Sequence, residues 1–229
     1  MSGAAALALA AAAVLLRIAW SDSHRRAWAL LAIAGGVGYF ALRSAPQLMP
    51  GAQNLGEHWN WSGHLLALSG MVALAALLRR RAGLSAGDLG LAAPVHLGTA
   101  TAVTAAALLA SYGLNRASGG QLQDVPAETW LFLATMPGLV EEMAFRGVLL
   151  AAAERAAPAT RRLAGVRVST GALLLTLAFV AMHGVGLGTL ISVLPAAMLY
   201  LWLRLATGSV LVPIVAHNLW NLSVLAGHL

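Results

Sequence analysis

The stretch Gly138-Leu139-Val140-Glu141-Glu142-Met143-Ala144-Phe145-Arg146-Gly147 places two adjacent carboxylates and one arginine inside an apolar segment. Apolar runs precede and follow it, at 130–136 and 148–153. A charged side chain within a bilayer costs from about 2.5 to more than 10 kcal/mol, depending on the reference state. Such charges are therefore rare, they pair with one another, and they mark sites of chemistry or transport. The stretch predicts a functional site within the membrane.

The composition of the whole chain supports the membrane interpretation. Of the 229 residues, 59% are hydrophobic and only 10% are charged, and the mean hydropathy is +0.78. A soluble domain carries about 25% charged residues, so this chain cannot cover a water-facing surface. Its apolar runs lack the alternating pattern of barrel strands, which favours helices.

The apolar residues divide into eight segments, at 3–20, 27–43, 63–78, 95–112, 128–153, 168–184, 188–206 and 209–227. We therefore predict an all-α, polytopic membrane protein of about eight transmembrane helices. Residues 1–229 are expected to form one membrane domain, in which 1–112 supply four N-terminal helices and 126–225 the helices that carry the polar motifs. The chain shows no internal repeat of the kind that builds a two-halved transporter.

The basic residues are all arginine, and they gather in alternate connections between the segments. These are Arg25, Arg26, Arg79, Arg80, Arg81, Arg155, Arg161, Arg162 and Arg167. The positive-inside rule predicts that these connections are cytoplasmic and that both termini are extracytoplasmic. Topology and contact with lipid headgroups thus explain the net charge of +6, and we expect no nucleic-acid partner. Because cysteine and lysine are absent, thiolate chemistry and Schiff-base chemistry are excluded.

Helical spacing separates the roles of the two central carboxylates. Glu142 and Arg146 lie at i and i+4, so they share one helix face and can pair. Glu141 points about 100° away from Glu142, which leaves it free to act as a base.

Further polar side chains occur in two later apolar segments. His183 follows Phe179 by one helical turn, and His217 precedes Asn221 by one turn. A glutamate beside a histidine can remove a proton from water, and a second histidine with an amide can donate to a developing oxyanion. These groups together suffice for hydrolysis of a carbonyl compound without a covalent nucleophile.

The three motifs, Glu141-Glu142-x-x-x-Arg146, Phe179-x-x-x-His183 and His217-x-x-x-Asn221, occur in this order over about residues 126–225. In this they resemble the CAAX protease and bacteriocin-processing (CPBP or Abi) family of intramembrane glutamic-type endopeptidases. The resemblance implies an eight-helix fold with an intramembrane catalytic cavity, built by the catalytic helices at 126–225. It also implies that Glu141 activates water with help from His183, and that His217 and Asn221 form the oxyanion hole. Glu142, Arg146 and Phe179 would then be supporting residues.

We expect no cofactor, because the amide of Asn221 is a natural oxyanion donor and a poor metal ligand. The alternative is a divalent metal such as zinc, held by Glu141, His183 and His217. The chain lacks the His-Glu-x-x-His motif of ordinary zinc proteases.

The substrate is expected to be a membrane-anchored protein or peptide. The lysine-free, Ala- and Arg-rich composition is typical of prokaryotes with high genomic GC, which points to the plasma (inner) membrane. The charge pattern places His183 near the outer face and so favours an extracytoplasmic opening and the C-terminal sorting or anchor tail of an exported protein. The alternatives are a CAAX-type prenyl-protein endopeptidase, a non-catalytic bacteriocin-immunity or scaffold protein, and a proton-coupled carrier.

Two features outside the motifs are interpreted as interfacial. The stretch Glu57-His58-Trp59-Asn60-Trp61 has the pattern of an aromatic belt, with a substrate-contacting loop as the alternative. His64, close to the start of a segment, is expected at the membrane surface.

Overall fold

The computed structural model describes residues 3–48, 55–117 and 125–227, and these are almost entirely helical. The elements are α1 (Gly3–Ala19), α2 (Ser23–Leu48), α3 (Trp61–Arg81), α4 (Leu97–Ala117), α5 (Ala127–Glu142), the π-helix η1 (Met143–Val148), α6 (Leu149–Ala156), β1 (Thr160–Leu163), β2 (Val166–Ser169), α7 (Thr170–Met182), α8 (Leu187–Thr207) and α9 (Leu211–Gly227). Because α5, η1 and α6 follow one another without a break, the described chain contains eight helical rods.

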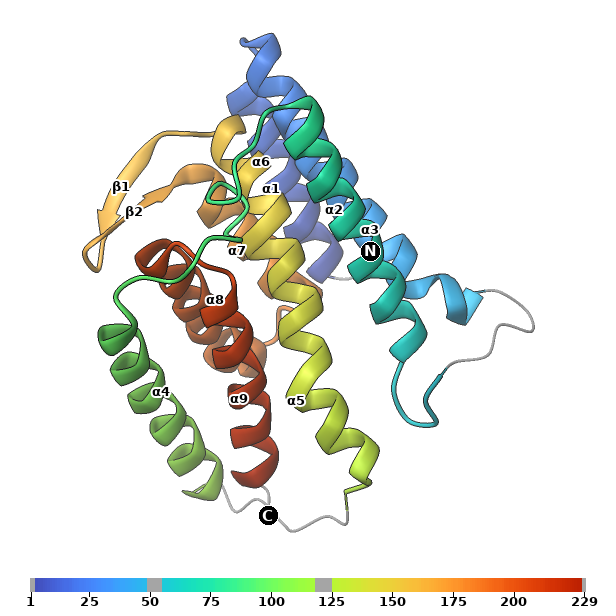
Figure 1. The fold of residues 1–229 in the computed structure, drawn as a ribbon, viewed down its shortest axis with the longest axis vertical. Coiled ribbons are helices and arrows are strands. Elements are labelled where there is room, and N and C mark those ends of the chain that lie inside the picture. Colours follow the sequence, from blue (N-terminus) through green and yellow to red (C-terminus); the bar gives the residue numbers. More distant parts are fainter. Residues whose placement is uncertain (1–2, 49–54, 118–124, 228–229) are drawn as a thin grey trace.

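Four of the described helices, α2, α3, α4 and α8, are long and apolar enough to cross a membrane. Helices α1, α7 and α9 are shorter apolar helices. In Figure 1 the rods lie side by side, with α5 and α6 running through the middle and α4 at one edge of the bundle. The predicted all-α, polytopic membrane fold is therefore confirmed.

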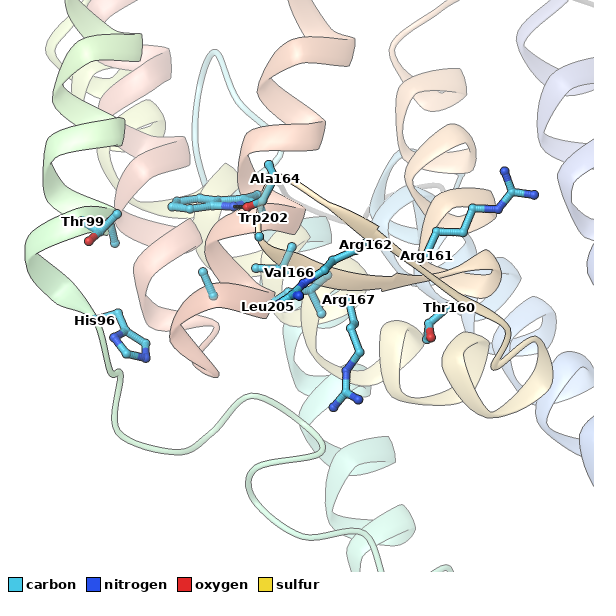
Figure 2. A pocket seen from close by; sticks show the side chains of 13 residues that line it. His96, Thr99, Thr160, Arg161, Arg162, Ala164, Val166, Arg167, Trp202 and Leu205 are labelled. Carbon is cyan, nitrogen blue, oxygen red and sulfur yellow. Dashed lines mark hydrogen bonds between the residues drawn. The ribbon is translucent and has the colours of Figure 1, made fainter.

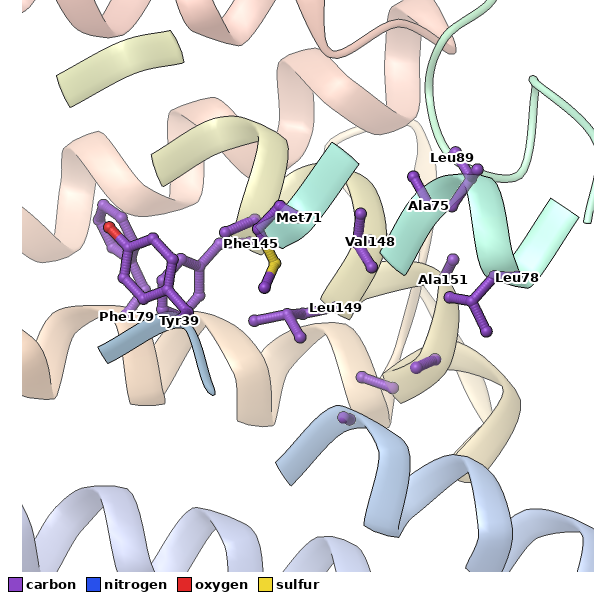
Figure 3. Packing of buried hydrophobic residues seen from close by; sticks show 14 of the residues in the cluster. Tyr39, Met71, Ala75, Leu78, Leu89, Phe145, Val148, Leu149, Ala151 and Phe179 are labelled. Atoms are coloured by element: carbon purple, nitrogen blue, oxygen red, sulfur yellow. The ribbon is translucent and has the colours of Figure 1, made fainter. Parts of the chain in front are cut away.

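The core forms where the middle rod meets its neighbours. Met71 and Leu78 of α3 face Val148 and Leu149 of the middle rod, and all four side chains are buried (Figure 3). Many large apolar side chains elsewhere stay exposed, and Leu109 of α4 is 73% exposed. Exposed apolar surface on this scale suits contact with lipid chains rather than water.

The connection between α6 and α7 differs from the sequence-based expectation of an Arg-rich loop. It forms an antiparallel hairpin in which Arg162 pairs with Arg167 and Leu163 with Val166. The two turn residues, Ala164 and Gly165, both have positive φ, at 46° and 83°. This is the geometry of a type I′ turn, whose twist matches that of the strands that it joins.

The Arg-rich end of the bundle is closed by the connection at 82–96. Arg204 of α8 donates from Nε to the carbonyl of Arg146, at 3.0 Å, and from Nη2 to the carbonyl of Asp88, at 3.1 Å. The Asp88 carboxylate in turn accepts from Arg155 at the end of α6, at 2.8 Å. These contacts fix the connection across the ends of α6 and α8.

Candidate active site

One cavity, of about 620 Å³, brings together four polar residues from three helical segments. Glu141 comes from α5, His183 from the residue that follows α7, and His217 and Asn221 from α9. The remaining wall comes from α2, from α3 and residues 58–60 before it, and from Phe132, Leu133 and Pro137 of α5. The four residues that the sequence motifs singled out thus share one cavity.

Glu141 is buried, and its two oxygens face different partners. Its Oε1 lies 3.5 Å from Nη1 of Arg43, an ion pair that was not predicted from the sequence. Its Oε2 lies 3.8 Å from Nε2 of His183 and accepts no hydrogen bond from the described residues. A separation of 3.8 Å is too long for a direct hydrogen bond.

The tautomer of His183 follows from its other ring nitrogen. Nδ1 lies 3.0 Å from the carbonyl oxygen of Phe179. Because a carbonyl only accepts, Nδ1 carries the proton, and Nε2 of the neutral ring is an acceptor. Two acceptors, Nε2 of His183 and Oε2 of Glu141, therefore face each other across the gap.

Glu142 is fully buried and is shared between a histidine and an arginine. Its Oε1 accepts from Nδ1 of His217 at 2.8 Å. Its Oε2 lies 3.3 Å from Nε of Arg146. The pairing with Arg146 that i, i+4 spacing predicts is present, although residues 143–148 form the π-helix η1, a feature that often occurs at functional sites.

Aromatic rings surround the buried Arg146 and His217. The guanidinium of Arg146 lies 4.1 Å from the ring centre of Phe179, and it also donates from Nη2 to the carbonyl of Ala197, at 3.0 Å. The ring of Tyr200 stacks on His217, with 4.7 Å between centres. Phe179 thus acts on the site through Arg146, and Tyr200 is a neighbour that the motifs do not reveal.

Asn218 joins α9 to α5 at the bend that Pro137 introduces. Its Oδ1 accepts from the amide of Gly138 at 2.8 Å, and its Nδ2 donates to the carbonyl of Thr135 at 3.2 Å. A proline inside a helix disturbs the backbone ladder around it, so side-chain partners are needed there. A Cβ at Gly138 would meet the α9 backbone at Ile214, which shows how closely the two helices approach. Asn218, which follows His217 in the chain, thus helps to fix the position of His217 relative to Glu142.

The stretch before α3 lines the mouth of the cavity. Trp59 stacks on Phe132 at 4.7 Å, and its indole donates to Thr129 at 2.9 Å. Asn60 donates to the carbonyl of Arg43 at 2.7 Å, which ties the end of α2 to α3. His64, in the first turn of α3, is buried and lines the same cavity, so its side chain faces the protein interior. Its T-shaped contact with Phe132 accounts for its burial.

The alternative metal site would consist of Glu141, His183 and His217, which all line this cavity. In the part of the chain that the structure describes, no three His, Asp or Glu side chains group closely enough to hold a metal ion. Nδ1 of His217 is directed at Glu142, and Asn221, which also lines the cavity, offers only an amide.

Comparison with known proteins gives one match. Residues 124–223 match the family model described as type II CAAX prenyl endopeptidase Rce1-like. This region contains all three motifs and agrees with the resemblance that they carry. No curated protein and no solved structure was found to match the chain.

Proposed function

Because residues 124–223 match the family model of the Rce1-like type II CAAX prenyl endopeptidases, we propose that Glu141 and His183 activate a water for peptide-bond hydrolysis without a metal ion. The match supports a protease-type function in the membrane, and the mechanism and the substrate are our proposals. The observation that carries the mechanism is the 3.8 Å gap between Oε2 of Glu141 and Nε2 of His183.

A water in this gap would donate one hydrogen bond to each acceptor. Both groups then polarise the same O–H bonds, and Glu141 takes the proton as the oxygen attacks the carbonyl carbon of the substrate. Arg43, whose Nη1 lies 3.5 Å from the other oxygen of Glu141, pairs with the carboxylate and orients it toward His183.

The opposite wall of the cavity would stabilise the oxyanion. The Asn221 side chain makes no hydrogen bond within the described part of the chain, so its amide is available to donate. His217 donates a hydrogen bond from Nδ1 to Glu142 and faces the cavity as well. Its Nε2 donates to an oxyanion only when the ring carries a proton on both nitrogens. The tetrahedral intermediate then collapses and its C–N bond breaks. The leaving amine takes the proton that Glu141 received from the water.

The direction of the opening follows from α3, which has the cavity at one end and the Arg-rich face at the other. Asn60, immediately before α3, lines the cavity, whereas Arg79, Arg80 and Arg81 end the helix about 30 Å away. If the positive-inside rule holds, the cavity opens outside the cytoplasm. We therefore propose an exported, membrane-anchored substrate, such as a protein with a C-terminal sorting tail.

A second cavity supports lateral entry of such a tail. It has a volume of about 380 Å³ and lies among α1, α2, α6 and α7, with Ala8, Ala12 and Gly36 on its walls. Phe40 lines both this groove and the catalytic cavity. We propose that the apolar anchor of the substrate lies in the groove while the adjoining extended segment reaches Glu141.

The function is tested by comparative membrane proteomics of a strain that lacks the gene. We expect at least one exported protein to keep a hydrophobic C-terminal segment that the parent strain removes, and re-expression of the wild-type chain to restore the removal. If no membrane protein changes its processed form, the protease proposal is wrong. This experiment also supplies the substrate for the measurements below.

Filling the lateral groove should affect anchored substrates selectively. Gly36→Phe adds a ring at a position where a Cβ meets nothing within 4 Å, so the fold is kept. We expect cleavage of the anchored substrate to fall about tenfold, the loss of about 1.4 kcal/mol of docking energy, and cleavage of a short peptide without an anchor to be unchanged.

Gly38→Phe is the matched control, because Gly38 also lies on α2 with open space at its Cβ but does not line the groove. Equal losses in the two variants, or equal losses for both substrates, would show that the groove does not receive the anchor.

A further inference from the structure

The β-hairpin between α6 and α7 has one face with two arginines and an opposite face that is mostly apolar. Partners in an antiparallel register place their side chains on the same face. Arg162 and Arg167 are partners and share the cationic face. Leu163 and Val166 are partners on the other face, which also carries the pair of Arg161 and Val168, and Val168 is buried against the core.

The cationic face borders a cavity of about 970 Å³ at the Arg-rich end of the bundle. Figure 2 shows the two arginines of this face, with His96 and Trp202 on other walls and Arg161 extending away from them. No aspartate or glutamate lines the cavity, and in the described ranges neither Arg162 nor Arg167 has an ion-pair partner. Like charges directly opposite across two strands destabilise the pair, so an anion between them would relieve the repulsion.

The start of α4 adds to the positive potential of this cavity. Thr99 and Ala100, in the first turn of the 21-residue helix, line it. The N-terminal end of a helix carries a partial positive charge and unpaired amides that favour anions. Two arginines and a helix N-terminus therefore converge on one space.

An apolar cavity of about 450 Å³ continues from the cationic one. Its walls include Leu163 of the hairpin, Met198 of α8 and Val103 of α4. The two cavities share Ala164, Val166 and Trp202. The indole of Trp202 donates to the carbonyl of Ala164 at 2.9 Å, which fixes the hairpin turn on α8 at the junction.

We propose that the joined cavities bind one anionic phospholipid from the membrane leaflet at the Arg-rich face. The phosphate lies between Arg162 and Arg167, and an acyl chain lies along Leu163 and Met198. A free phosphate would use only the cationic cavity, whereas the apolar continuation fits an amphiphile. The bound lipid fills the space between α4 and the hairpin and so holds this edge of the bundle together. The proposal is independent of the protease activity, because the catalytic cavity shares none of these residues.

The test is thermal unfolding of the full-length protein in a neutral detergent with added lipid. Phosphatidylglycerol is expected to raise Tm by about 2–5 °C, because a ligand that binds only the folded state stabilises it. Phosphatidylcholine with the same acyl chains, and inorganic phosphate alone, are expected to give much smaller shifts. A full shift with inorganic phosphate would reduce the site to a free-anion site, and equal shifts with the two lipids would overturn the role of charge.

Two variants locate the site. Arg162→Gln/Arg167→Gln is expected to lose the phosphatidylglycerol shift, whereas Arg79→Gln/Arg80→Gln, an equal charge change at exposed residues of the same membrane face, is expected to keep it. Met198→Trp, which fills the apolar cavity without changing charge, should also reduce the shift. Retention of the full shift in the hairpin double variant, or in Met198→Trp, would contradict the proposed lipid position. Should the double variant fail to fold, Met198→Trp alone still decides the outcome.

Discussion

Glu141→Gln is expected to insert and fold like the wild-type protein while substrate cleavage falls by about 10²–10⁴-fold, the contribution of a positioned general base. Glutamine has nearly the same shape as glutamate and can still accept a hydrogen bond from Arg43. It cannot take a proton from a water held opposite Nε2 of His183, 3.8 Å from the carboxylate. The measurement is processing of the substrate after re-expression in the deletion strain, with the protein level and Tm determined in parallel.

Tm serves as the internal control of this experiment, because an inactive but unfolded variant would say nothing about the base. Unchanged cleavage by a folded Glu141→Gln protein would remove Glu141 from the mechanism. Asn221→Ala tests the opposite wall of the cavity. Removal of one oxyanion donor is expected to lower substrate cleavage about 10²–10³-fold.

Arg146→Ala is expected to destabilise the protein by about 3–5 kcal/mol as well as to abolish cleavage. Arg146 and Glu142 are both buried, and removal of the guanidinium leaves the carboxylate with the ring of His217 as its remaining side-chain partner. It also leaves the carbonyl of Ala197 without its donor. The measurement is thermal unfolding in detergent, followed by tryptophan fluorescence.

Two further variants show whether the loss of stability comes from breaking the buried pair of Glu142 and Arg146 or from removal of any arginine. Arg155→Ala breaks a pair with Asp88 in which both side chains are about one-third exposed, so we expect a loss of at most about 1 kcal/mol. Glu142→Gln/Arg146→Met removes both buried charges and should recover part of the stability without recovering activity. A wild-type Tm for Arg146→Ala would mean that the buried carboxylate is compensated by another group.

The local parts of the site could be predicted from the sequence, because helical spacing fixes which residues share a face. The i, i+4 rule anticipated the pair of Glu142 and Arg146, and it separated Glu141 from both. The apolar segments likewise gave the helices, since composition alone decides which stretches can lie in lipid.

The long-range partners could not be predicted in this way. Arg43 reaches Glu141 from α2, and Asn218 reaches the bend in α5 from α9. Each contact depends on how two helices pack against each other. The periodicity of one helix shows which residues share a face, but not which other helix lies against that face. The bonding of His217 to Glu142 is of the same kind, because 75 residues separate them.

The hairpin left a local signal that the loop interpretation did not use. The alternation in Val166-Arg167-Val168 and the turn residue Gly165 are typical of a hairpin. Because arginine dominates this connection, it was interpreted only as a marker of membrane topology. The structure places two of these arginines, Arg162 and Arg167, on one face of the hairpin.

The central claim is that this cavity hydrolyses a peptide bond with Glu141, His183 and no metal ion. The most direct measurement is cleavage of the identified substrate by the purified wild-type protein in liposomes, prepared without metal and assayed with and without a chelator. We predict the same cleavage rate under both conditions, and no cleavage by Glu141→Gln. Loss of cleavage on chelation, with recovery on addition of zinc, would contradict the account.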